Sequence, residues 1–328
     1  MKTIYSIQLP SSIITDRIPA RTTLPRGCLY PVEHADVQHM KWSEGEIIRQ
    51  RFIAYDFMLE LFEINLQEDV VIRVAFKKPC VIFYYGVIGS IVCDDIQNSR
   101  SSTLGAGQYG AINTPAGKYQ MTISRGCSCG FLYIFDTGYL GNFLNMHPSD
   151  FLSGRHYRIG SPVCHTFPFF TIGSVGQIYQ QLTAVYSERR SMSLKMALLN
   201  LLKEYGAQLT RLKSKPLTEG SEKLLPVKQY LDHQVKNGPL PHASEIAMQF
   251  HIHPDTLSRL FKDNCGVGVK KYINQIKMQQ AFALLTRDRL SILTVSEMMG
   301  YNSTSSFSTQ FRSYYGFPPG KAGGKKLI

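Results

Sequence analysis

The sequence predicts a two-domain α+β protein, with an antiparallel β barrel or sandwich and following helices in the first part and an all-α domain at the C-terminal end. Short segments rich in Val, Ile, Phe and Tyr alternate with turn residues between positions 51 and 136. Helical periodicity begins near residue 173, and a helical segment near the C-terminus occurs twice in similar form. A length of 328 residues also suits about two domains.

We divide the chain where composition and periodicity change. The expected parts are a β-rich domain with an N-terminal arm (1–172), a helical segment (173–213), a linker (214–224), a helical domain (225–320) and a basic tail (321–328). Prolines at positions 10, 19, 25 and 31 interrupt the first 40 residues. We therefore expect an irregular arm that lies on the first domain.

Six segments of the first domain have strand composition and are separated by turn residues: 57–66, 70–76, 80–93, 109–113, 118–124 and 129–136. Residues 81–85 are apolar at every position, which indicates a central strand. A barrel or sandwich of this size can hold one small ligand in its interior. The candidate lining residues are Arg73, Tyr84, Tyr109 and Tyr119, and the alternative for each is core packing or a surface position.

Gly105 to Gly110 matches the G-x-G-x-x-G pattern of dinucleotide-binding proteins. That pattern requires a buried strand before it and a helix after it, whereas here a polar segment precedes it and strand residues follow. We therefore interpret it as a turn. Because we find no clustered metal ligands or acid and base residues between 40 and 140, we expect no cofactor, no metal and no enzymatic activity.

Residues 174–188 and 192–212 are predicted helices. The second carries an apolar stripe at helical spacing: Leu198, Leu202, Tyr205, Leu209 and Leu212. The stripe suits either a dimer interface or packing on the protein's own β domain. Residues 213–221 are polar and contain Pro216 and Gly220, as expected of a linker.

The repeated segment begins at Leu257 and again at Phe307, an offset of 307 − 257 = 50 residues. Each copy is an amphipathic helix that ends at a glycine, Gly266 or Gly316, and a shorter helix precedes each copy. Ala247 and Ser296 are small enough for two helices to cross closely. The pattern predicts two helix-turn-helix units, in which the second helix of each pair enters the DNA major groove.

These residues resemble the AraC/XylS family of transcription regulators. The resemblance spans roughly 225–319 and is carried by these residues: Ile246-Ala247, Leu257-x-Arg259-x-Phe261-Lys262, Gly266-Val267, Tyr272-Ile273, Ala281, Leu284-Leu285, Ile292, Gly300-Tyr301, Phe307-Ser308, Phe311-Arg312 and Gly316-x-Pro318. His253 and Ser296 depart from the usual Ser and Ala, and Thr294 and Thr309 from an acidic residue and an Arg. The resemblance implies a cupin-like effector domain, a homodimer, contact with RNA polymerase and an activator.

The resemblance also assigns DNA contacts to the two recognition helices, which should begin near Pro254 and Thr304. The base-reading candidates are His253, Asp255, Ser258, Arg259, Thr304, Ser305, Ser308 and Thr309. Arg259 can bond two guanine acceptors, and its alternatives are a phosphate or Asp255. The phosphate-contact candidates are Lys262, Lys270, Lys271, Lys277 and Arg312. A rigid helix over 270–285 would place the two units about one DNA turn apart, on a bipartite or repeated promoter site.

The charge of the chain agrees with this interpretation. The chain has 36 Lys and Arg residues against 24 Asp and Glu residues, a net charge of +12. From Pro226 onward there are 13 Lys and Arg residues and 6 Asp and Glu residues, so 13 − 6 = +7 of this charge lies in the helical domain and the tail that follows it. Seven cysteines without framework spacing, no apolar run long enough for a membrane span and no signal peptide indicate a cytoplasmic protein. The rival hypotheses are a constitutive architectural DNA-binding protein and a cupin-type enzyme.

Overall fold

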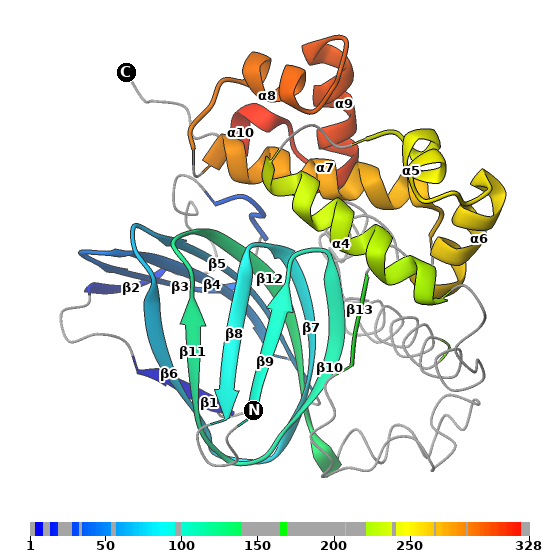
Figure 1. The fold of residues 1–328 in the computed structure, drawn as a ribbon. Helices are drawn as coiled ribbons and strands as arrows, with labels where there is room; N and C mark the ends of the chain where they lie inside the picture. Colours follow the sequence, from blue (N-terminus) through cyan, green and yellow to red (C-terminus); the bar gives the residue numbers. More distant parts are fainter. Residues whose placement is uncertain are drawn as a thin grey trace, which may run out of the picture. The chain divides into compact units, whose positions relative to one another are not determined.

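The computed structural model describes residues 4–8, 14–18, 28–32, 35–53, 57–95, 100–138, 165–168, 207, 221–237, 241–265, 267–286 and 288–322. The chain divides into two compact units, one of residues 1–167 and 182–206 and one of residues 168–181 and 207–328. Figure 1 shows the first as a β structure and the second as a group of helices. Among the described residues, no helix combines the length and apolar character needed to cross a membrane.

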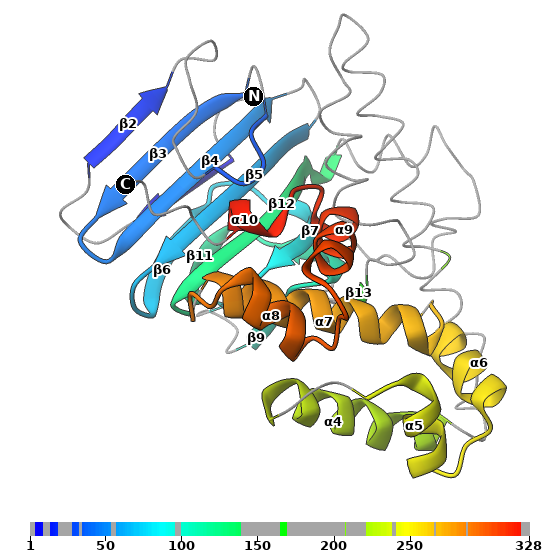
Figure 2. The same ribbon diagram turned by 90° about the horizontal axis from the view of Figure 1, so that it is seen from above.

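The β unit consists of two antiparallel sheets. One has five strands in the order β1-β6-β11-β8-β9, and the other has eight in the order β13-β10-β7-β12-β5-β4-β3-β2. The predicted barrel or sandwich is thus formed as two separate sheets, which face each other in Figures 1 and 2. The strands are β1 (Tyr5–Gln8), β2 (Ile14–Ile18), β3 (Asp36–Trp42), β4 (Gly45–Ile53), β5 (Phe57–Leu66), β6 (Val70–Phe76), β7 (Cys80–Ile88), β8 (Ser90–Asp95), β9 (Arg100–Gly105), β10 (Gln108–Thr114), β11 (Gly117–Ile123), β12 (Gly126–Asp136) and β13 (His165–Pro168).

Strand bounds follow the local chemistry where turn residues flank an apolar segment. β5 and β6 begin and end where the sequence predicts, and β7 is buried along its whole length between β10 and β12, as expected of a central strand. The predicted strand over 80–93 is two strands, β7 and β8. Gly89 divides them because its φ of 71° turns the chain in a conformation that favours glycine.

Two other sequence expectations were wrong. The arm contributes β1, β2 and the start of β3 to the sheets instead of lying on the domain as an irregular segment. The segment 94–107, expected as a connection, contains β9, which pairs with β8. The turn interpretation of 105–110 is confirmed, because β9 ends at Gly105 and β10 begins at Gln108 after a turn that contains Gly107, with φ 74°.

The helical unit contains α4 (Ser221–Asn237), α5 (Ala243–Gln249), α6 (Pro254–Cys265), α7 (Val269–Thr286), α8 (Ile292–Met298), α9 (Thr304–Tyr315) and α10 (Pro319–Ala322). One core joins α4, α5, α6 and the start of α7 through side chains that include Val227, Ile246 and Phe261. A second is aromatic: Phe282 of α7 packs against Phe311 of α9, with ring centroids 6.3 Å apart. The predicted helix 174–188 lies outside the described residues, and so does the predicted helix 192–212 with its stripe from Leu198 to Leu212, except for the exposed, helical Ala207.

Candidate DNA-binding surface and internal cavity

The first helix pair, α5 and α6, is joined by residues 250–253. Ala247 is buried at the crossing, and its carbonyl accepts a hydrogen bond of 2.9 Å from the backbone N–H of Ile252, which is itself buried. The Glu245 carboxylate caps the start of α5 by accepting a bond from the backbone N–H of His242 (2.9 Å). These contacts fix the angle at which α6 leaves the turn.

The second pair, α8 and α9, repeats this arrangement across residues 299–303. Ser296 is buried where Ala247 lies in the first pair, and its carbonyl accepts a 3.0 Å bond from the backbone N–H of Tyr301. Ser303 caps α9 through its side chain, and Gly316 ends it in the left-handed conformation. The predicted starts at Pro254 and Thr304 are both confirmed, whereas Gly266 lies outside the described residues.

Each turn contains one residue with positive φ. In the second pair it is Gly300, with φ 74°, and in the first it is His251, with φ 50°. The backbone therefore bends in the same way in both pairs, but only the second pair uses the residue type that adopts this conformation without strain.

The residues predicted to read bases lie at the first two turns of α6 and α9 and just before α6. The following are exposed: His253, Asp255, Arg259, Thr304, Ser305 and Thr309. Ser258 and Ser308 are half-buried. Within the described part of the chain, Arg259 forms no ion pair with Asp255, so its guanidinium is not neutralised by that neighbour. The Thr309 hydroxyl donates to the backbone carbonyl of Ser305 (3.0 Å).

His253 takes the place of a capping residue at the start of α6. Its Nδ1 accepts a hydrogen bond of 3.3 Å from the backbone N–H of Asp255, which requires an unprotonated Nδ1. The same atom lies 3.7 Å from a carboxylate oxygen of Asp255, an ion pair that would require a protonated Nδ1. Only one of the two interactions exists at a time, and we favour the hydrogen bond because both side chains are highly exposed and their ion pair would be screened by water.

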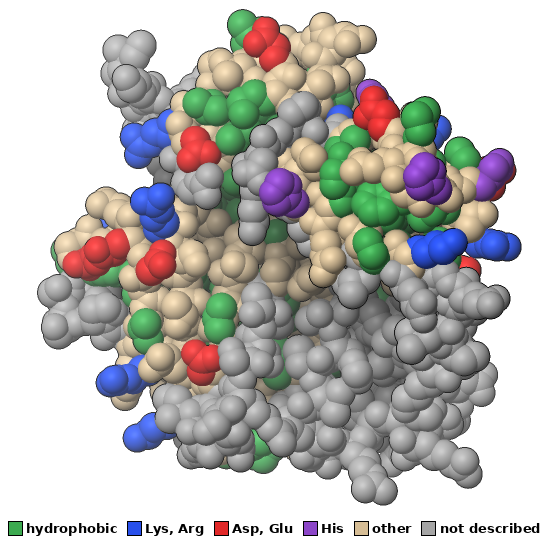
Figure 3. All heavy atoms as spheres, viewed as in Figure 1, with side chains coloured by type: hydrophobic (Ala, Val, Ile, Leu, Met, Phe, Trp, Pro, Cys, Tyr) green, Lys and Arg blue, Asp and Glu red, His purple; other side chains and the backbone are tan. Residues whose placement is uncertain are grey.

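A groove of 910 Å³ lies beside the first pair, lined by the first turns of α5, α6 and α7 and by the turn of the second pair. Three of the predicted phosphate contacts line it, namely Lys270, Lys271 and Lys277. Burial lowers the pKa of Lys277, an effect that the charge of Glu245 opposes. Lys262 and Arg312 are exposed and do not line this groove. Figure 3 shows Lys, Arg, His and acidic side chains among hydrophobic ones over the first helix pair.

Helix α7 is fastened to both pairs. Its Tyr272 ring packs on Phe261 of α6, with centroids 5.0 Å apart. Its Asn274 accepts a hydrogen bond from the Tyr301 hydroxyl (3.0 Å), and the Tyr315 hydroxyl of α9 donates to the carbonyl of Met278 (3.2 Å). Helix α7 is therefore packed against α6 at one end and hydrogen-bonded to the second pair at the other.

The β unit contains a cavity of about 160 Å³ between its two sheets. Its walls are mainly aliphatic and aromatic, with Ile47, Phe62 and Ile64 from the eight-stranded sheet and Ile72 and Val74 from the five-stranded sheet. The walls belong to the core between the sheets, because all five side chains are buried.

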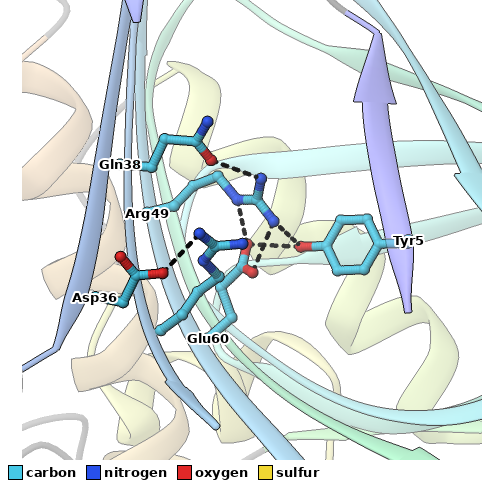
Figure 4. Close-up of polar contacts among 6 residues, drawn as sticks. Tyr5, Asp36, Gln38, Arg49 and Glu60 are labelled. Atoms are coloured by element: carbon cyan, nitrogen blue, oxygen red, sulfur yellow. Dashed lines mark hydrogen bonds and ion pairs between the residues drawn. The ribbon is translucent and has the colours of Figure 1, made fainter. Parts of the chain in front are cut away.

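One end of the cavity is polar, where Tyr5, Arg49 and Glu60 meet (Figure 4). Arg49 donates to both oxygens of the Glu60 carboxylate, each at 2.8 Å. The Tyr5 hydroxyl donates to Glu60 (2.7 Å) and accepts from Arg49 (2.7 Å), and the Gln38 amide oxygen accepts a further Arg49 bond at 3.3 Å. Burial and the Glu60 charge raise the pKa of Tyr5, so its phenol stays protonated.

Two of the four predicted lining residues, Tyr84 and Tyr119, line this cavity. Arg73 and Tyr109 do not. Alternation along β6 turns Arg73 to solvent between the buried Ile72 and Val74, and Tyr109 stacks on Tyr85, next to Tyr84 in β7 and on the opposite face of the strand. The sequence analysis missed Tyr5, Arg49 and Glu60. Their signal is a charged residue inside an apolar strand, visible at Glu60 in the segment Phe57–Leu66.

The chain was compared with known proteins. A family model described as a helix-turn-helix domain matches residues 246–323. The Msm operon regulatory protein of Streptococcus mutans is 29% identical over 112 residues, which are 32% of this chain and 40% of that protein. The transcriptional activator RhaS of Escherichia coli is 30% identical over 74 residues, 23% of this chain and 27% of RhaS.

A longer match is to YfiF of Bacillus subtilis, an uncharacterised HTH-type transcriptional regulator, with 30% identity over 145 residues, 44% of this chain and 45% of YfiF. The chain thus spans less than half the length of these relatives. Among solved structures, apo ToxT of Vibrio cholerae is 15% identical with a TM-score of 0.35, covering 82% of this chain and 97% of ToxT. Residues 246–323 therefore match a helix-turn-helix domain, and the relatives similar to this chain include HTH-type transcription regulators.

Proposed function

We propose that this protein is a sequence-specific DNA-binding transcription regulator whose β unit senses a small molecule. The observation that carries the proposal is the repeated helix pair, each with a capped second helix that presents exposed polar side chains at its first turns. In this arrangement the second helix of each pair enters a major groove and its first residues contact base edges.

The roles of the side chains follow from their chemistry. Arg259 is the candidate base-reading residue, because its planar guanidinium can donate two hydrogen bonds to guanine and no carboxylate of α6 neutralises it. Lys270, Lys271 and Lys277, which line the groove beside the first pair, would contact phosphates, as would the exposed Lys262 and Arg312. Helix α7 would hold α6 and α9 in successive major grooves on one face of the DNA.

The resemblance to AraC-type regulators supports the remaining parts of the proposal. These are a cytoplasmic homodimer, activation of transcription through RNA polymerase, and an effector held in the β unit. A change in the cavity would shift the population of DNA-competent arrangements, which requires that the effector bind one arrangement more tightly than the other.

The experiment is selection of genomic DNA fragments by the full-length protein at physiological salt, followed by affinity measurements on the best site. We expect a bipartite motif. Arg259→Ala should weaken binding by ~1 to 3 kcal/mol and relax the preference at one base pair. The matched control is Arg312→Ala, which should weaken binding equally for all sequences and lower the salt dependence. If Arg259→Ala also weakens all sequences equally, Arg259 does not read a base.

A further inference from the structure

The cavity of the β unit is small and almost entirely apolar. Its volume is about 160 Å³, and its walls are dominated by Ile, Val, Phe and Tyr side chains from both sheets. An engineered apolar cavity of about 150 Å³ stays dry and binds benzene. A volume of this size suits an occupant of roughly one substituted six-membered ring.

Among the described residues that line the cavity, the charged ones are Arg49 and Glu60, and they neutralise each other. The Nε and Nη2 atoms of Arg49 each donate a hydrogen bond to one oxygen of the Glu60 carboxylate. Nη2 donates a second hydrogen bond to the Tyr5 hydroxyl. Both charged side chains are nearly fully buried, with 6% and 2% of their surface exposed. The polar end of the cavity therefore carries a closed ion pair rather than an available cation.

This pairing determines which ligand charge the cavity accepts. An anionic ligand would have to lose its hydration and then compete with Glu60 for Arg49, while facing the Glu60 carboxylate at close range. An uncharged ligand has no such cost. It can place a hydroxyl near Tyr5 and Glu60 or near Thr114, which is buried in the wall, and bury its ring among the aliphatic side chains.

We propose that the cavity binds an uncharged, largely apolar molecule of the size of a substituted benzene ring with one hydrogen-bonding group, and that it rejects organic anions of the same size. The proposal rests on the sensor role given to the β unit in the proposed function. It specifies the chemical class of the effector.

The probes are 4-methylphenol and 4-methylbenzoate, which share a ring and a methyl group and differ in charge at neutral pH. Titration calorimetry on the full-length protein should show 4-methylphenol binding about tenfold or more tightly than 4-methylbenzoate. Equal or tighter binding of 4-methylbenzoate would overturn the proposal, and so would a failure of both probes to bind.

Two variants locate the binding and test its cause. Ile112→Trp places a large side chain in the cavity wall and should abolish binding of 4-methylphenol; unchanged binding would place the ligand elsewhere and overturn the proposal. Glu60→Gln removes the negative charge, leaves Arg49 available and should reverse the preference toward 4-methylbenzoate. Its control, Arg49→Gln, leaves the carboxylate and should keep the anion out. The wild-type comparison decides the question even if a variant does not fold.

A second readout separates this proposal from the proposed function. The affinity of the same preparation for its selected DNA site is measured against a scrambled site. Sequence preference without binding of 4-methylphenol would leave the regulator in place and refute the ligand class. Binding of 4-methylphenol without any sequence preference would leave the ligand class in place and refute sequence-specific regulation.

Discussion

The buried ion pair of Arg49 and Glu60 should destabilise the β unit strongly when only one partner is removed. Glu60→Leu leaves the Arg49 guanidinium buried without its carboxylate, and Arg49→Met leaves the carboxylate without its cation. Each single change should cost ~3 to 5 kcal/mol, because the remaining charge keeps its desolvation penalty and loses its compensation. The double variant removes both charges and keeps apolar volume, so it should cost less than either single change.

Trp42 gives an assay confined to this unit. It is the only tryptophan of the chain and packs against the core between the sheets, so its fluorescence follows unfolding of the β unit in urea. With a urea dependence of ~2 kcal/mol per M, a loss of ~4 kcal/mol lowers the midpoint by ~2 M. The reasoning would be refuted if the single variants lost less than ~1 kcal/mol, or if the double variant lost the sum of both.

Three further predictions concern the turns, the aromatic core and a buried thiol. Gly300→Ala should destabilise the helical unit by ~1 kcal/mol in calorimetry, because an added Cβ has space but the φ of 74° is unfavourable for alanine. The control, His251→Gly, should not destabilise the unit. Equal losses of unfolding free energy in the two variants would contradict this prediction. Phe311→Ala should cost ~3 to 5 kcal/mol and Phe311→Leu clearly less, because the Phe311 ring is fully buried and contacts the rings of Phe282, Phe307, Tyr315 and Phe317. An unfolding temperature of Phe311→Ala within a degree or two of wild type would contradict this prediction. Burial and the Glu63 carboxylate raise the pKa of Cys129, so the thiolate is scarce at about pH 8. After treatment with an alkylating reagent at this pH, mass spectrometry should find the Cys129 thiol unmodified in the folded protein and modified once the protein is unfolded.

Local chemistry predicted the elements whose ends are marked in the sequence. The predicted starts of α6 near Pro254 and of α9 near Thr304 and the predicted end of α9 at Gly316 match the structure, as do the predicted bounds 57–66 and 70–76 of β5 and β6. The strands of the arm were missed because their stability comes from pairing at sheet edges, with partners as distant as Phe76 for Tyr5. A single sequence carries no signal for such long-range pairing.

The cavity could be predicted only in outline, for the same reason. Arg49 and Glu60 lie on neighbouring strands, where the β4 and β5 register pairs Arg51 with Glu60 and brings the Arg49 side chain diagonally onto the carboxylate. Tyr5 joins them from the other sheet. The sequence shows a charge inside an apolar strand, but the register decides whether that charge meets a partner, a ligand or solvent.

The two recognition helices are not equivalent, and the difference bears on how a bipartite site would be read. α6 presents Arg259, a long side chain with several donors, whereas the exposed residues at the start of α9 have short hydroxyl side chains. One of these hydroxyls, that of Thr309, is already bonded within the helix. Because α7 is fastened to both pairs, we expect α9 to fix the register of the protein on the DNA and α6 to discriminate between bases. We therefore expect base changes beneath α6 to lower the affinity for DNA more than base changes beneath α9. An equal loss of affinity at both half-sites would mean that the Ser and Thr side chains of α9 discriminate between bases as strongly as Arg259 does.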